Sequence, residues 1–122
     1  MQLILTRDSV AAGDDFDAPH RRIIKVTEGL PLDALLRRVT ETKYLPSISG
    51  GAATWSVTSG VPLAVIAQQW DDIKWLPGAL HERAALDLRD GALHLHFNYH
   101  TQIDPGIVFE VLRGLQLRSP GY

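Results

Sequence analysis

The sequence predicts an α+β fold in which two helices pack on one face of a single-layer, largely antiparallel sheet of about five to six strands. Short segments alternate apolar and polar residues, two segments carry apolar residues at helical spacing, and glycine-containing turns separate neighbouring strand candidates. No internal repeat or long linker interrupts the chain. We therefore expect one domain over residues 1–122.

The first half begins with two strand candidates and a helix. Residues 2–6 are apolar and residues 21–27 are rich in β-branched side chains, which favours strands. Residues 30–40 place three leucines and a valine at helical spacing. Pro31 suits the first turn of this helix, because the missing N–H has no intrahelical partner there.

Two further strands are expected to form a hairpin. Residues 53–59 alternate Trp55 and Val57 with hydroxyl side chains, which is typical of a strand with one solvated face. After Gly60, residues 62–69 form a mostly apolar segment that should pair antiparallel with the preceding strand. Residues 70–83 lack periodicity, and over residues 79–86 a helix and a loop both remain open.

The chain should end with a second hairpin and a helix. Asp90 and Gly91 separate strand candidates at residues 86–89 and 92–100, and this pair favours a tight turn with positive φ. Asp104 followed by proline indicates a helix start. Five apolar residues then recur at helical spacing, so this helix should pack on the sheet: Ile107, Val108, Val111, Leu112 and Leu115.

Composition excludes several functional classes. The chain has no cysteine, which rules out disulfide scaffolds, thiolate metal sites and thiol catalysis. Twelve basic and fourteen acidic residues give a net charge of −2, so direct nucleic-acid binding through a strongly basic surface is not expected. The longest apolar run is too short to span a bilayer, and no leader is evident. We expect a cytoplasmic protein with no membrane partner.

Acidic residues concentrate in the loop between the first two strand candidates. No basic residue separates its four aspartates, whose mutual repulsion a cationic partner or ion would relieve. The spacing is not that of an EF-hand. A solvated loop, an acidic patch that binds a protein, and a metal or catalytic carboxylate pair all fit the pattern of Asp8, Asp14, Asp15 and Asp17.

A second acidic element lies between two tryptophans. Asp71 and Asp72 are flanked by Trp70 and Trp75. Aromatic residues beside carboxylates are typical of interface hot spots, because tryptophan offers a large contact area at little entropic cost. Core packing of the two indoles is the alternative interpretation.

The strand candidate at residues 92–100 carries polar residues at every second position. Strand geometry places His94, His96, Asn98 and His100 on one face, here called the histidine face. A solvated face, a surface that contacts RNA or a partner, and a metal site at His94, His96 and His100 all remain open. A third metal ligand would come from His20 or an aspartate in the last case.

No known catalytic motif supports an enzyme. The sequence lacks a nucleophile elbow, a phosphate-binding loop, a dinucleotide fingerprint and a complete zinc-protease motif. We therefore expect a protein without enzymatic activity or cofactor.

Three segments carry a resemblance to known proteins. LTRDSVAAGDD, APH at residues 18–20 and YLPSISGGAATW at residues 44–55 resemble small bacterial proteins associated with the immunity proteins of polymorphic and contact-dependent toxin systems. The resemblance implies a protein that neutralises one cognate toxin domain, often a basic nuclease, by covering its active site. It supplies no catalytic residues.

The leading hypothesis is accordingly an immunity-type inhibitor that is a monomer or weak dimer when free. Its toxin-binding surface would comprise Asp8, Asp14, Asp15, Asp17, Trp70, Asp71, Asp72 and Trp75. The alternative is a metal-dependent or RNA-processing enzyme that uses the histidine face. A structural subunit that dimerises through a sheet edge is a third possibility.

Overall fold

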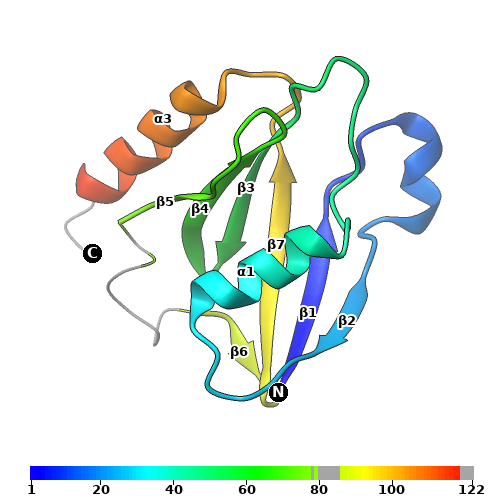
Figure 1. The fold of residues 1–122 in the computed structure, drawn as a ribbon, viewed down its shortest axis with the longest axis vertical. Coiled ribbons are helices and arrows are strands. Elements are labelled where there is room, and N and C mark those ends of the chain that lie inside the picture. The colour runs from blue at the N-terminus through cyan, green and yellow to red at the C-terminus, as the bar shows by residue number, and fades with distance from the viewer. Residues whose placement is uncertain (78, 80–85, 119–122) are drawn as a thin grey trace.

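A computed structural model of the chain describes residues 1–77, 79 and 86–118. Within these residues, helices and one mixed sheet confirm the predicted α+β fold (Figure 1). In chain order the elements are β1 (Gln2–Arg7), the 3-10 helix η1 (Ala12–Asp17), β2 (Arg22–Lys25), α1 (Leu32–Glu41), β3 (Thr54–Ser59), β4 (Val61–Ala67), β5 (Lys74–Trp75), β6 (Leu88–Arg89), β7 (Ala92–Tyr99) and α3 (Pro105–Arg118).

The sheet has seven strands in the order β2-β1-β7-β3-β4-β5, and β6 also pairs with β7. All pairs are antiparallel except β1 and β7, which run parallel, with Leu3 opposite Leu93. The predicted, largely antiparallel arrangement is therefore confirmed. The added strand, β5, is only two residues long and lies where the sequence shows no alternation.

The turns follow the local sequence signals. Asp90 and Gly91 adopt φ angles of 53° and 75° between β6 and β7, as expected for a tight hairpin. The Asp104 carboxylate accepts a hydrogen bond of 2.8 Å from the backbone N–H of Gly106 at the start of α3. The open question over residues 79–86 falls largely outside the described residues.

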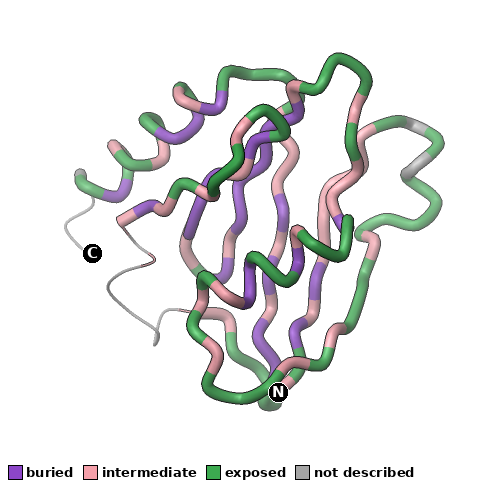
Figure 2. Tube along the Cα trace, viewed as in Figure 1, coloured by how far each residue is buried: buried purple, intermediate pink, exposed green. Residues whose placement is uncertain are grey.

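The main core lies between α1 and one face of the sheet. The helix buries Leu35, Leu36 and Val39, and alternate residues of β1, β3 and β7 complete the cluster (Figure 2). Strand alternation explains this face, because Trp55 and Val57 point toward α1 while their polar neighbours do not. With two residues of β4, the core strand residues comprise Leu3, Leu5, Trp55, Val57, Leu63, Ala64, Leu93, Leu95 and Phe97.

The expectation that both helices pack on one face is wrong. Val65 of β4 packs with Val108 and Phe109 of α3, in a second cluster. Its neighbour Ala64 belongs to the main core, and successive strand residues point to opposite faces. The physical reason is the composition of β4, which has apolar residues on both sides and therefore needs a helix on each face.

Only part of the apolar surface of α3 is covered. Val108 and Phe109 are buried, whereas Ile107, Val111 and Leu115 are between 56% and 61% exposed. Residues 107, 111 and 115 form a row next to the buried one, turned by about 100° around the helix axis. The expectation that all five apolar residues pack on the sheet is therefore corrected, because the sheet covers only one row.

Candidate functional site

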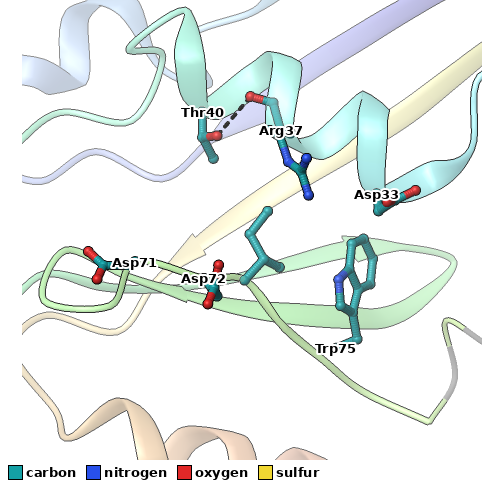
Figure 3. Close-up of a pocket in the computed structure, with 7 residues that line it drawn as sticks. Asp33, Arg37, Thr40, Asp71, Asp72 and Trp75 are labelled. Atoms are coloured by element: carbon teal, nitrogen blue, oxygen red, sulfur yellow. Dashed lines mark hydrogen bonds between the residues drawn. The ribbon is translucent and has the colours of Figure 1, made fainter.

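A hollow of about 290 Å³ separates α1 from the segment that leads into β5 (Figure 3). It is called the acidic hollow below. It is lined by Asp33, Arg37, Thr40, Asp71, Asp72, Ile73 and Trp75.

Helical spacing places three residues of α1 along one wall of the acidic hollow. Asp33, Arg37 and Thr40 are four and three residues apart, so they share one side of the helix. The Thr40 hydroxyl donates a 2.8 Å hydrogen bond to the carbonyl of Arg37. Because Leu35, Leu36 and Val39 face the core, the side of α1 that carries Asp33, Arg37 and Thr40 faces away from it.

The opposite wall comes from the bend before β5. Ile73 and Trp75 pack partly against the main core and so stay fixed. Asp71 and Asp72 are exposed beside them. Figure 3 shows Arg37 extending from α1 into the hollow, with Asp33 near the Trp75 indole.

The acidic hollow carries uncompensated negative charge. Three aspartates and Arg37 give a formal charge of −2. Across the described part of the chain, none of these four groups forms an ion pair. Carboxylates beside an indole ring suit a guanidinium or ammonium group, which gains Coulombic attraction and a cation–π contact.

Trp70 does not join this hollow. It packs against the second cluster beneath α3, and the Lys74 ammonium lies 5.7 Å from its ring centroid. The structure therefore brings together Asp71, Asp72 and Trp75 but places Trp70 elsewhere. The prediction from sequence missed Asp33 and Arg37, because helix periodicity alone does not say which loop faces α1.

The 3-10 helix η1 presents a separate acidic surface. Asp15 and Asp17 are exposed, and Phe16 between them is 95% exposed. The side chain of Asp14 is outside the described set. Phe16 was missed from the sequence, although a single apolar residue within DDFD was the available signal.

Asp8 belongs to neither acidic surface. Its carboxylate accepts a hydrogen bond of 2.9 Å from the backbone N–H of Tyr99 and lies 3.0 Å from Nε2 of His96. The other ring nitrogen of His96 lies 2.7 Å from the Thr6 hydroxyl. Asp8 thus ties the end of β1 to β7, and its assignment to the toxin-binding surface stays a prediction.

The histidine face does not assemble a metal centre. His94 contacts Arg89 at 3.1 Å, and His100 contacts the Ser56 hydroxyl at 2.7 Å. His96 contacts Asp8 and Thr6, so each of the three imidazoles contacts different side chains and the three do not share a ligand. No group of three His, Asp or Glu side chains among the described residues is placed to hold a metal ion. The hypothesis of a site at His94, His96 and His100 is therefore not supported.

The environment of His100 predicts a pH-dependent stability. Burial lowers the pKa of His100 below its ordinary value of 6.5, and the Asp8 carboxylate partly opposes this shift. As pH falls, the unfolded chain binds the proton first. The contribution of neutral His100 is thus present above pH 6.5 and is lost below it.

We expect His100→Gln to reduce the loss of unfolding free energy between about pH 7.5 and about pH 5, since the variant cannot bind this proton. Urea unfolding of both proteins at each pH measures the difference. An identical pH dependence in the two proteins would contradict the assignment.

Comparison with known proteins does not identify a family for this chain. No protein-family model, curated protein or solved structure matches this chain. Separately, the described helices include none with the length and apolar character needed to cross a membrane.

Proposed function

We propose that this chain is a cytoplasmic immunity-type protein of a bacterial contact-dependent toxin system. It binds one cognate toxin domain, a nuclease, and covers the active site with an acidic surface. In this proposal it needs no cofactor and catalyses no reaction.

The acidic hollow is the observation that supports this proposal best. Its three aspartates and Trp75 surround a space large enough for one basic side chain, and its −2 charge is uncompensated within the described residues. A nuclease active site presents arginine and lysine side chains that otherwise bind phosphates. Such a side chain would enter the hollow and stack on Trp75.

Phe16 supplies a second contact of a different kind. A phenylalanine that is 95% exposed gains apolar burial only when a partner covers it. Asp15 and Asp17 flank it and would meet cations at the rim of the same interface. This arrangement of an aromatic anchor with charged neighbours is common at interface hot spots.

The test compares two variants, each with two aspartates neutralised, with a control. One variant carries Asp71→Asn and Asp72→Asn, and the other carries Asp15→Asn and Asp17→Asn. The control carries Glu41→Gln and Glu110→Gln, which changes net charge equally at exposed sites outside both acidic surfaces. A partner captured at low salt is purified, and its association rate is measured at several salt concentrations.

We expect each aspartate variant to lower the association rate about tenfold and to flatten its salt dependence, because opposed charges steer association. The control should change both much less. The captured protein should also kill cells when expressed alone and be harmless together with this chain. A stoichiometric partner that binds both aspartate variants at the wild-type rate at low salt would overturn the proposal.

A further inference from the structure

The side of α3 that faces away from the sheet is largely apolar (Figure 1). Ile107, Val111, Leu115 and Leu117 are between 56% and 63% exposed, and Ile103, just before the helix, is 49% exposed. At about 100° per residue, the four helix residues lie within about 80° of Ile107 around the helix axis. They form one surface, which is called the outer face of α3 below. With Ile103, it holds five of the eight large apolar side chains that are exposed in the described part of the chain.

The outer face of α3 is large enough for a specific contact between proteins. Its apolar side chains expose on the order of 500 Å², which reaches the range in which apolar patches mark interaction sites. Two such faces packed together would bury about 1,000 Å², the lower limit for a specific protein–protein interface. Interfaces of this size are typical of weak, reversible complexes.

The apolar residues of this face are complementary to themselves when two copies pack antiparallel. Ile107 and Leu115 lie four residues before and after Val111. A twofold axis at Val111 therefore places Ile107 of each copy opposite Leu115 of the other, and the two Val111 side chains opposite each other. The contact is thus apolar along its whole centre.

The charges beside this face match in the same arrangement. Glu110 and Arg113 lie along one edge of the face and form a 2.9 Å ion pair within the helix. A twofold axis across an antiparallel helix pair brings the same edge of both helices together. Because the two residues are one before and two after Val111, Glu110 of each copy comes level with Arg113 of the other, to within about 2 Å along the helix. Opposite charges therefore meet at the rim of the contact.

Gly114 lies near the middle of the outer face of α3. A glycine weakens a helix relative to alanine, and Gly114 does not adopt a positive φ that would require one. Space within the chain does not require it either, because a Cβ added there would meet no neighbouring atom within 4 Å. The missing side chain instead allows the backbone of a second helix to approach closely.

We propose that this chain forms a symmetric dimer in which the outer faces of two α3 helices pack antiparallel about a twofold axis at Val111. A second copy fits this surface because the apolar residues, the Glu110–Arg113 charges and the open space at Gly114 all match in that register. The acidic hollow lies beside α1, on the other face of the sheet. The dimer therefore does not depend on the acidic hollow or on toxin binding.

Sedimentation equilibrium of the untagged, intact chain tests the dimer. Between about 5 µM and about 1 mM, the average mass should rise from the 13.5 kDa of one chain toward twice that value, with a Kd of about 10–100 µM. A chain that stays monomeric over this range would overturn the proposal and would leave the outer face of α3 to a different protein, such as the toxin.

Two glutamate variants locate the contact. Val111→Glu places two like charges opposite each other on the twofold axis and should weaken association about tenfold or more. Ile23→Glu is the matched control, because it adds the same charge at an exposed apolar position of the edge strand β2 and should leave association unchanged. Urea unfolding checks that both variants are folded. Association that is unchanged in Val111→Glu, or equally weakened in Ile23→Glu, would overturn the proposal.

A pair of charge reversals tests the antiparallel register. Glu110→Arg and Arg113→Glu each bring like charges together across the interface, so each variant alone should associate about threefold more weakly or worse. An equimolar mixture of the two variants pairs opposite charges again and should regain most of the wild-type affinity. A mixture that associates as weakly as the single variants would overturn the proposed packing.

Discussion

Replacing Phe97 with alanine should lower the free energy of unfolding by about 3–5 kcal/mol, because it leaves a cavity in the centre of the core. Phe97 is fully buried in β7, the strand to which β1, β3 and β6 all pair. Its ring also meets Tyr44 edge to face, with 5.8 Å between centroids. Urea unfolding monitored by circular dichroism measures the change.

Phe16→Ala is the matched control for this prediction. It deletes the same side chain from a position that is 95% exposed, so unfolding free energy should change little. A loss for Phe16→Ala as large as that for Phe97→Ala would contradict the burial of both residues. Together the two variants also separate stability from binding, because only Phe16 is assigned to the toxin interface.

Replacing Asp8 with alanine should destabilise the fold by about 1–2 kcal/mol, because the N–H of Tyr99 loses its acceptor and His96 loses one of its two partners. Asp8→Asn should cost less, since an amide oxygen still accepts from Tyr99. Asp71→Ala is the control, because Asp71 is exposed in the bend before β5. Chemical unfolding of the three variants gives the order of effects.

If Asp8→Ala and Asp71→Ala cost the same, the Asp8 contacts do not stabilise the fold. If Asp8→Ala instead leaves stability unchanged and weakens toxin binding, its original assignment to the toxin surface would stand. The two results are distinguishable because stability is measured on the free protein.

Local patterns predicted most elements of this fold. The alternation around Trp55 and Val57 identified β3, and the leucine spacing of α1 identified the helix that covers it. These patterns work because one face of each element is buried and the other is not. β4 carries apolar residues on both faces, which indicates that both faces are covered, but its sequence does not say which helix covers which face.

Long-range pairings were beyond the reach of these patterns. Nothing in residues 2–6 indicates a parallel partner about ninety positions away, and β5 is too short to show a period. For the same reason, Asp8 was grouped with its sequence neighbours although its contacts are His96 and Tyr99. Grouping sequence neighbours was right for Asp71, Asp72 and Trp75, because all three lie in one segment that lines the acidic hollow.

The helix α3 shows a related limit. Its sequence holds two adjacent apolar rows, and periodicity does not distinguish the row that packs from the row that stays exposed. Val108 marks the buried row and Val111 the exposed one. The sheet geometry decides between them, and that geometry depends on strands far along the chain.

The parallel pairing of β1 with β7 has a consequence for synthesis of the protein. The β1–β2 pair and the β3–β4 pair are joined into one sheet by β7, which leaves the ribosome after those four strands. Until then, two separate hairpins expose edges of unpaired N–H and C=O groups, which is the condition for aggregation. Fast synthesis as far as β7, or a chaperone that shields these edges, therefore matters more for this protein than for a sheet built from consecutive hairpins.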